Sequence, residues 1–257
     1  MLNRQNIVSY LTISRKETIR FLRIWPQTIL PSAITIALYY VIFGNLIGPR
    51  IGDMEGYSYI KFIVPGLTMM SVITNSYANV VASFFSAKFQ RYIDELLISP
   101  TANSIILLGY ITGGILRGCI VGVIVLLISV FFTDLSIDNL YITASIIFLT
   151  SVLFSLAGFL NGIFARKFDD VSIVPTFVLT PLTYLGGVFY SITMLPEFWQ
   201  TVSLGNPILY MVNAFRYGML GQSDINIFTA YLLIIGFIIA LYWINIYLLR
   251  KGFGIRT

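Results

Sequence analysis

Hydrophobic and polar positions alternate along this chain in long blocks. Six apolar blocks are separated by short polar segments, and five of the six contain no charged residue. They cover residues 24–49, 62–87, 105–132, 141–165, 171–196 and 225–249, and only the third is interrupted, by Arg117. About 20 helical residues cross a hydrocarbon core, whereas a membrane β-barrel shows alternating segments of about ten residues. The pattern therefore predicts an all-α integral membrane protein with six transmembrane helices, folded as one domain over residues 1–257.

Composition supports this fold class and excludes several functions. Hydrophobic residues make up 57% of the 257 positions and charged residues 11%, which is more apolar surface than a soluble domain can bury. The chain has no histidine, so metal sites and proton relays built from histidine are excluded. Cys119 is the single cysteine and cannot form an intrachain disulfide. We expect no metal and no cofactor to be bound by this chain.

Basic residues predict the orientation of the spans. Twelve of the 16 lysines and arginines precede the first block, follow an even-numbered one, or end the chain. They are Arg4, Arg15, Lys16, Arg20, Arg23, Lys88, Arg91, Arg166, Lys167, Arg250, Lys251 and Arg256. The positive-inside rule places them in the cytoplasm, so both termini and the tail 250–257 are expected on that side of a bacterial inner membrane. The net charge of +5 then reflects topology and gives no reason to expect a nucleic-acid partner.

The polar segment 86–103 predicts a short amphipathic helix over residues 86–100, ended by Pro100. At 100° per residue, one side carries apolar positions and the other carries charged ones. The apolar side holds Phe89, Tyr92, Ile93, Leu96 and Leu97, and the charged side holds Lys88, Gln90, Arg91, Asp94 and Glu95. Two interpretations follow: an interfacial helix lying on lipid headgroups, or a docking element for a soluble partner.

Residues 1–26 predict a second amphipathic helix, ahead of the first span. The basic residues Lys16, Arg20 and Arg23 share one face of it. The opposite face holds Ile7, Leu11, Phe21, Leu22 and Trp25. This pattern is typical of a helix lying flat on the inner leaflet as an anchor, and contact with a cytoplasmic partner is the alternative.

Two spans have unusual compositions. The third carries small residues at four-residue spacing, which favours close packing on another helix. These residues are Gly109, Gly113, Gly114, Gly118 and Gly122. Arg117 lies among them and either faces protein, water or a substrate path, or is displaced towards an interface by helix tilt. The fifth span is interrupted by Pro175, Pro181 and Gly186-Gly187, so it is expected to border the core or a cavity.

The segment 191–224 is aromatic and carries few charges, so it predicts short helices that re-enter the outer half of the membrane. An outer aromatic belt is the alternative, because tryptophan and tyrosine favour interfaces. The order of these elements resembles the membrane subunit of ABC-2 type exporters. The matching strings are residues 84–91 running into 95–97, and 206–210 followed by 215–216. The resemblance covers essentially the whole chain.

The resemblance implies site residues that periodicity alone does not give. Residues 86–100 would be a coupling helix that inserts into a cleft of an ATP-binding cassette subunit. Its contact residues would be Lys88, Phe89, Arg91, Tyr92, Asp94, Glu95, Leu96 and Leu97. Asp169 and Asp170 would lie near a second contact, and residues 15–23 near a third. Asn206, Pro207, Tyr210 and Arg216 would form the re-entrant motif.

No Walker A loop occurs, because none of the five lysines follows a glycine. The chain is therefore not expected to be an ATPase, and ATP and magnesium belong on a separate subunit. The resemblance also implies two copies of this chain and an amphipathic substrate, such as a lipid-linked glycan, a lipid or a hydrophobic drug. Candidates for the substrate path are Arg117, Tyr39, Tyr184, Phe189 and Tyr190, with packing or belt roles as the alternative.

Other function classes are less well supported. A secondary transporter needs an intramembrane acid, and no aspartate or glutamate lies within a predicted span. A membrane enzyme needs a catalytic constellation, which the sequence does not contain. A scaffold that anchors an ATPase without transport remains open.

Overall fold

The computed structural model describes residues 4–254, and helices account for most of them. The first half contains α1 (Arg4–Arg23), α2 (Trp25–Thr28), α3 (Leu30–Tyr39), η1 (Tyr40–Ile47), α4 (Gly48–Ile51), β1 (Asp53–Met54), β2 (Tyr57–Ser58), α5 (Tyr59–Phe89), α6 (Tyr92–Ile98) and α7 (Asn103–Ser129). The second half contains α8 (Leu140–Phe164), α9 (Phe168–Val174), η2 (Pro175–Leu179), α10 (Thr180–Tyr184), η3 (Ile192–Met194), α11 (Glu197–Leu204), α12 (Pro207–Leu220) and α13 (Ile227–Lys251). The strands β1 and β2 form a two-stranded antiparallel hairpin, a small addition to the expected all-α fold.

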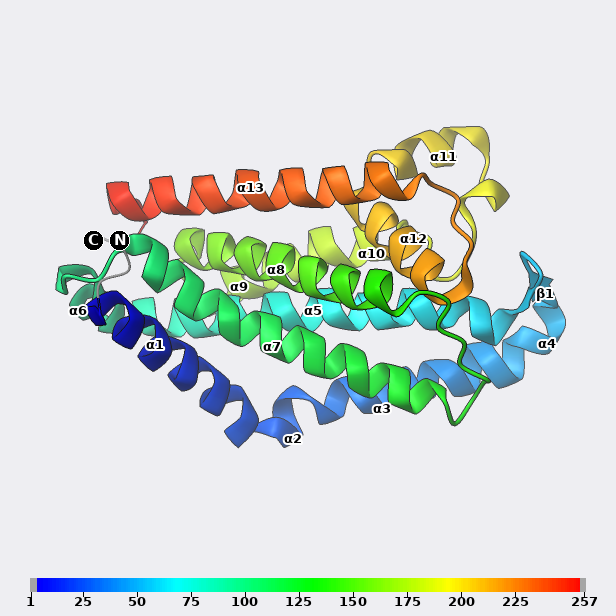
Figure 1. Cartoon of the computed structure of the whole chain (residues 1–257), viewed down its shortest axis with the longest axis horizontal. Coiled ribbons are helices and arrows are strands. Elements are labelled where there is room, and N and C mark those ends of the chain that lie inside the picture. Colours follow the sequence, from blue (N-terminus) through cyan, green and yellow to red (C-terminus); the bar gives the residue numbers. More distant parts are fainter. Residues whose placement is uncertain (1–3, 255–257) are drawn as a thin grey trace.

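The long helices run along the long axis of the molecule, with α5 in the middle of the bundle (Figure 1). Helices α7 and α8 pack on α5 most extensively, α1 packs on α7, and α13 packs on α8 and α12. Because the helices are nearly aligned, the loops gather at two opposite ends. One end holds both described termini together with α6, and the other holds α4 and the hairpin (Figure 1).

Within residues 4–254, four helical segments are long and apolar enough to cross a membrane: Trp25–Ile51, α7, α8 and α13. They match four of the six predicted spans to within a few residues. The second predicted span lies within α5, which is longer than the others but carries polar side chains along its buried face. The fifth predicted span, 171–196, is too long: its helical part ends at Tyr184, and Gly187 follows in a left-handed conformation at φ 70°.

The polar side chains of α5 explain its lower hydropathy. Ser71, Ser76 and Thr68 are buried, and each donates a hydrogen bond to a carbonyl of the preceding turn, 2.6 to 3.0 Å away. Hydroxyls satisfied in this way can lie inside a helix bundle at little cost. The helix therefore places its polar residues against its neighbours, which accounts for a central element of modest hydropathy.

The first span contains a bend, followed by a π-helical segment. The bend lies at Ile29, between α2 and α3, where Pro31 has no N–H to continue the helix. A π-helical segment, η1, follows, and a second, η2, lies in the fifth predicted span. Each of them ends two residues before a proline, Pro49 or Pro181. Such segments commonly mark functional positions in membrane and soluble helices.

The glycines of α7 allow three helices to approach it closely, which confirms the predicted role of their spacing. A Cβ at Gly109 would lie 2.6 Å from Ile13 of α1, and one at Gly114 would lie 2.4 Å from both Val80 of α5 and Ser155 of α8. These distances are shorter than any real contact. Helix α7 is therefore held by α1, α5 and α8, with glycine required at the crossing points.

Replacing Gly114 with alanine is expected to destabilise the protein by about 1–3 kcal/mol, since Val80, Ser155 and the backbone oxygen of Ser76 must move. Thermal unfolding in detergent measures the change. Gly236→Ala in α13 is the matched control, because nothing lies within 4 Å of the added Cβ. That control should be neutral or stabilise by up to about 1 kcal/mol. Equal melting temperatures for the two variants would contradict this packing.

Helix α1 differs from the predicted flat anchor. The apolar residues Ile7, Leu11 and Leu22 of α1 are exposed, as is Trp25 at the start of α2, which suits a membrane anchor, but Phe21 of α1 is fully buried. Arg20 leaves the predicted basic face and bonds to the backbone and side-chain oxygens of Asn79 in α5. The helix therefore packs on the bundle through one side and exposes a different apolar side. The expected face was wrong for Phe21 and Arg20 because tertiary contacts select the buried side.

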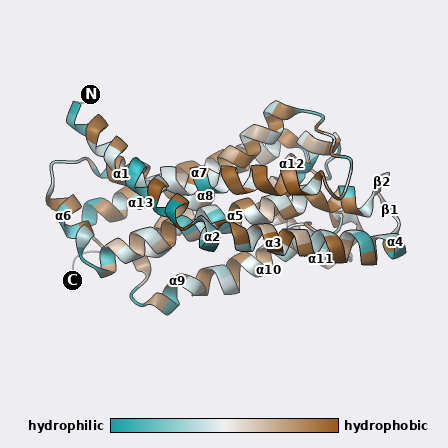
Figure 2. Cartoon of the chain, turned by 90° about the horizontal axis from the view of Figure 1, so that it is seen from below, coloured by the Kyte–Doolittle hydropathy of each residue, from teal (hydrophilic) through white to brown (hydrophobic). Residues whose placement is uncertain are grey.

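Charge is distributed unevenly between the two ends. The basic pairs Lys88 and Arg91, Arg166 and Lys167, and Arg250 and Lys251 lie at the end that holds both described termini. We call this the basic end; Arg256 falls outside the described residues. Figure 2 shows hydrophobic residues along much of the helices between the two ends, and hydrophilic ones at the ends and around the junction of α1 and α2. The middle of the molecule is thus the part that suits lipid.

Candidate functional site

The predicted coupling helix is divided in two. Helix α5 continues to Phe89, and α6 begins at Tyr92 after a turn in which Arg91 adopts a left-handed conformation at φ 63°. The prediction of one helix over 86–100 was therefore wrong. Because the turn redirects the chain, Lys88 and Phe89 belong to the end of a long helix, and only residues 92–98 form the short one.

Helix α6 lies at the basic end, with one side packed on the bundle and the other side exposed. Ile93 is buried, and Leu96 and Leu97 pack against the core formed by α5, α7 and α8. Tyr92 is 54% exposed and Ile98 is 85% exposed, and the exposed Glu95 lies between them. Leu96 and Leu97 hold α6 in place, so the outward surface consists of Tyr92, Glu95 and Ile98.

The side chain of Lys88, near the end of α5, is partly buried and is held by hydrogen bonds within the protein. Its Nζ donates to the carbonyl oxygens of Ile163 and Ala165, both at 2.6 Å, at the C-terminal end of α8. These carbonyls have no partner within the helix, and the lysine donates hydrogen bonds to them. Its positive charge is also favourable beside the negative end of the helix dipole. Burial lowers the pKa of Lys88, and the nearby Arg166 lowers it further. The predicted place of Lys88 on the outward charged side of a rod was wrong.

The turn between α8 and α9 is closed by Asp170. Its Oδ2 accepts hydrogen bonds from the backbone N–H groups of Arg166 at 2.8 Å and Lys167 at 3.0 Å. These backbone bonds hold the pKa of Asp170 below its usual value. Asp169 is exposed, and no hydrogen bond or ion pair of its side chain occurs within residues 4–254. Asp170 therefore shapes the turn, and Asp169 is available for other contacts.

Removing the Asp170 carboxylate should open this turn. Asp170→Ala in inverted membrane vesicles is expected to speed tryptic cleavage after Arg166 and Lys167 several-fold, because two N–H groups lose their acceptor. Asp169→Ala is the matched control and should be cleaved at the wild-type rate. Because the folded-state pKa of Asp170 is lowered, its contribution is present at neutral pH and is lost as pH falls through that pKa. Equal cleavage of both variants would contradict this role.

A cleft of about 830 Å³ lies beside α6 at the basic end. It is bounded by the end of α5, the start of α6, the end of α8 and the residues after α13, so four separate segments meet there. Phe89 packs on Phe168 with ring centroids 4.9 Å apart, and Phe85 packs on Phe168 at 5.0 Å. These contacts bring the α8–α9 turn, and with it Asp169 and Asp170, to the side of α6.

The aromatic residues predicted for the substrate path come together. Phe189 is the centre, with Tyr39 and Tyr184 each at 6.0 Å between ring centroids and Phe43 at 5.0 Å. The hydroxyl of Tyr190 donates to the backbone oxygen of Tyr184 at 3.0 Å. This cluster joins the first span to the end of α10. Phe43 is the member that the sequence did not single out.

Two small cavities lie on either side of Thr74 of α5. One, of about 210 Å³, is formed with α3, and the other, of about 80 Å³, is formed with η2 and α10. Both are lined by apolar and hydroxyl side chains, the first also by the amide of Asn75, and neither has a charged residue in its lining. The surface that α5 presents to α3 on one side and to η2 and α10 on the other is therefore uncharged at these cavities.

Arg117 is not part of the aromatic cluster. Its Nη2 donates to the backbone oxygen of Thr28 at 2.7 Å and to Oδ1 of Asn75 at 2.8 Å. The arginine thus faces protein and joins α7 to α5 and to the bend of the first span. These contacts agree with the interpretation in which Arg117 faces protein, and its role in a substrate path stays a prediction.

The segment before the last span forms the short 3-10 helix η3 and the two α-helices α11 and α12 at the other end. Asn206 caps α12 by accepting from the N–H of Ile208, and its Nδ2 donates to the carbonyl of Leu182 at 2.6 Å. Pro207 is the first residue of α12, and Tyr210 donates to the carbonyl of Leu204 in α11. The motif therefore fixes the angle between α11 and α12.

Arg216 is the largest fully buried side chain among the described residues. Its guanidinium lies 4.0 Å from the ring centroid of Phe62 and donates to the carbonyl of Gly187 at 2.6 Å. Close approach of this turn to α5 requires Gly66, whose added Cβ would lie 2.5 Å from the backbone oxygen of Val188. Arg216 thus anchors α12 to α5 and to the glycine turn.

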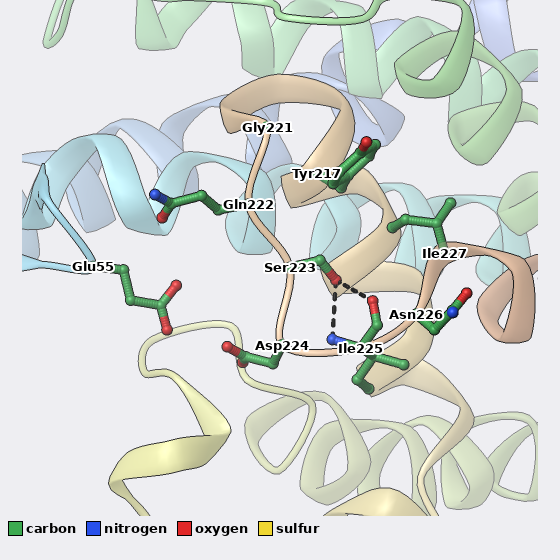
Figure 3. Close-up of a pocket in the computed structure, with 9 residues that line it drawn as sticks. All are labelled: Glu55, Tyr217, Gly221, Gln222, Ser223, Asp224, Ile225, Asn226 and Ile227. Carbon is green, nitrogen blue, oxygen red and sulfur yellow. Dashed lines mark hydrogen bonds between the residues drawn. The ribbon is translucent and has the colours of Figure 1, made fainter.

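A second, open pocket of about 640 Å³ lies at this end, beyond α12. The carboxylates of Glu55 and Asp224 point into the same side of it (Figure 3). Asp224 also accepts from the hydroxyl of Ser191 at 3.1 Å and from the N–H of Ile192 at 3.3 Å. No group of three potential metal ligands occurs in residues 4–254. The pocket is an acidic surface feature of the loop that precedes α13.

Comparison with known proteins decides the family. The family model described as ABC-2 type transporter matches residues 8–220 of the chain. The chain belongs to the ABC-2 type transporter family. The match runs from α1 to the end of α12, so it includes α6, the aromatic cluster and Arg216, and it ends before α13.

Individual relatives agree with the ABC-2 assignment. The chain is 56% identical over 250 residues to "Inner membrane transport permease YadH" of Escherichia coli (strain K12), covering 97% of this chain and 98% of that protein. It is 21% identical to "Nodulation protein J" of Neorhizobium galegae over 95% of this chain and 94% of that protein. The first relative and the apolar helices indicate that this ABC-2 chain is a transport permease of the bacterial inner membrane.

Sequence reasoning missed a polar layer of this ABC-2 permease between α1 and α5. Glu17 is 1% exposed, accepts from the hydroxyl of Ser83 at 2.5 Å, and pairs with Arg20 at 3.3 Å. Arg20 in turn holds Asn79. The available signal was Glu17 itself, the one acid among the basic residues of the N-terminal segment.

Proposed function

We propose that this chain is the membrane-spanning subunit of an ATP-driven exporter and that a separate ATP-binding cassette subunit hydrolyses the ATP. In this proposal six segments cross the inner membrane: Trp25–Ile51, α5, α7, α8, the unit from α9 to α10, and α13. The basic end lies in the cytoplasm, as the positive-inside rule requires, and α11 and α12 re-enter the outer half of the membrane. The chain itself binds no ATP or magnesium.

The outward surface of α6 carries this proposal. A short helix that is anchored by Ile93, Leu96 and Leu97 exposes Tyr92 and Ile98 on the side where the basic residues gather. An apolar side chain that is 85% exposed beyond the end of the bundle suits burial in a protein partner. Since α6 follows α5 directly, a force on α6 acts on the central helix of the bundle.

The mechanism follows from this connection. Closure of the ATPase pair around ATP would push α6, tilt α5 and alter its contacts with the first span and with the η2–α10 segment, the two parts of the chain that contain π-helical turns. A substrate path would then run beside Thr74 and the aromatic cluster of Tyr39, Phe43, Tyr184 and Phe189. The neutral lining of the two cavities and the aromatic rings support an amphipathic substrate with an uncharged contact surface.

A second copy of the chain is part of the proposal. The first span is the least covered, with 17% of its most apolar stretch buried against 50% in α8. Its α3 part borders one of the cavities beside Thr74, and η2 and α10 border the other. Two copies that meet at this side would enclose the cavities around Thr74, which one copy leaves open to lipid.

An export assay with an inactive partner tests the proposal. The ATPase is first identified as the Walker A subunit that co-purifies with the tagged chain. Mass spectrometry then compares lipids and glycans on the outer surface in three strains: wild type, one lacking the chain, and one with the Walker A lysine of the ATPase replaced by alanine. We expect the same compounds to disappear in the two altered strains. Normal export with the inactive ATPase would contradict ATP-driven transport and favour a scaffold.

A further inference from the structure

We infer that the cleft beside α6 binds a segment of the ATPase that carries an apolar side chain next to a carboxylate, and that the end of α13 forms one wall of this site. The inference rests on the proposed ATPase partner. It adds a site, formed by segments far apart in the sequence, to the contact made by α6 itself.

The walls of the cleft are aromatic. Phe89 of α5, Phe164 of α8 and Phe253 after α13 are each more than half exposed. The rings of Phe164 and Phe253 contact each other edge to face with centroids 5.7 Å apart. Three half-exposed rings around a cavity of about 830 Å³ leave room for a large apolar side chain, which would bury them.

The turn after α13 holds Phe253 in place. Gly252 and Gly254 have left-handed φ values of 65° and 69°, and the N–H of Phe253 bonds to the carbonyl of Leu248. A Cβ at Gly254 would lie 2.7 Å from the backbone oxygen of Ile163, so the chain passes directly over the end of α8. This glycine-dependent turn fixes the wall that α13 contributes.

The rim of the cleft is basic. Lys88, Arg91 and Arg166 line it, with Asp94 as the one acid among the lining residues. The ammonium of Lys88 is fixed by the carbonyls of α8, and the side chains of Arg91 and Arg166 are exposed. No ion pair of these four residues occurs within the described chain. A carboxylate beside the apolar side chain would pair with an arginine in charge-assisted hydrogen bonds.

A protein segment fits this site better than lipid does. The cleft adjoins the exposed face of α6, so a subunit that covers Tyr92 and Ile98 also reaches Phe253 from the same side. The aromatic walls suit an apolar side chain, and Arg91 and Arg166 form no ion pair within the described residues, so an arginine is available for a carboxylate beside it. Anionic phospholipid and the chain's own residues 255–257 are the competing occupants that the experiment must separate.

Photocrosslinking tests the position of the site. The amino acid p-benzoylphenylalanine replaces Phe253, Phe164 or Tyr92 in the full chain, expressed with the ATPase that co-purifies with wild type. We expect the ATPase to be crosslinked from all three positions. Phe228, which is 75% exposed at the start of α13 and at the opposite end of the molecule, is the control and should give no crosslink to the ATPase.

The outcomes separate the two proposals. A crosslink to the ATPase from Tyr92 but not from Phe253 or Phe164 would overturn the cleft site and leave the proposed function intact. Crosslinks from Phe253 only to phospholipid, or only to residues 255–257, would also overturn it. No ATPase crosslink from any position, with no ATPase in the purified material, would overturn both.

A charge reversal tests the chemistry of the segment. Arg166→Glu should weaken ATPase binding about tenfold, since one charge-assisted contact is replaced by repulsion. Lys167→Glu is the matched control: this residue is adjacent and exposed but does not line the cleft, and its change should alter binding less than twofold. Equal effects of the two reversals would show that the cleft has no preference for a carboxylate.

Discussion

Replacing both Tyr92 and Ile98 with aspartate is expected to abolish co-purification of the ATPase and to stop export. These side chains are the exposed apolar positions of α6, so the changes remove the contact surface and leave its packing on the bundle unchanged. Two buried anchors of an interface typically contribute about 2 kcal/mol or more each, which corresponds to an affinity loss of about a thousandfold. Quantitative pull-down of the purified chain with the ATPase measures it.

The control for this pair lies at the other end of the molecule. Phe131→Asp with Tyr141→Asp changes two side chains that are 87% and 89% exposed, and it should leave ATPase binding unchanged. The choice of Ile98 instead of Leu96 is important, because Leu96 packs against the core and its replacement would confuse unfolding with uncoupling. Wild-type binding by the Tyr92 and Ile98 variant would remove α6 from the interface.

Replacing Arg20 with methionine is expected to destabilise the protein by about 2–3 kcal/mol. The change leaves Glu17, which is 1% exposed, with Ser83 as its hydrogen-bond donor and no cation, and it releases the two oxygens of Asn79. Loss of one partner of a buried ion pair costs about 3–5 kcal/mol, and the partial exposure of Arg20 lowers that value. Thermal unfolding in detergent, followed by tryptophan fluorescence, measures the shift.

Two further variants identify the cause. Arg23→Met is the matched control, since Arg23 is exposed and forms no ion pair within residues 4–254, and it should melt as wild type does. Adding Glu17→Leu to Arg20→Met should recover much of the loss, because the unpaired carboxylate is then removed. If Arg20→Met were as stable as Arg23→Met, the polar layer between α1 and α5 would have no stabilising role.

Elements determined by local pattern were predictable from the sequence. The glycine spacing of α7 correctly indicated close packing, since only glycine allows backbones to approach at the crossing points with Ile13 and Val80. The bend at Ile29 has a similarly local cause, because Pro31 lacks the N–H that would continue the helix. The aromatic residues predicted for the substrate path also come together around Phe189.

Features that depend on tertiary contacts were not predictable. The break before α6 places Arg91 in a left-handed conformation, which a sequence usually signals by glycine or asparagine. Glu17 and Arg20 are spaced like an ordinary surface pair, and only their packing against α5 buries the glutamate. Lys88 was assigned to a solvent face because periodicity cannot show that the carbonyls of α8 lie within its reach.

The central claim is that a separate ATPase acts on α6 from the cytoplasm. Its most direct test places one cysteine at position 98, on a Cys119→Ser background that removes the native thiol. A membrane-impermeant maleimide is then applied to intact spheroplasts and to inverted vesicles, with and without the ATPase. The account predicts labelling only in inverted vesicles, and at least about tenfold slower labelling when the ATPase is bound. Labelling in intact spheroplasts, or an unchanged rate in the presence of the ATPase, would contradict it.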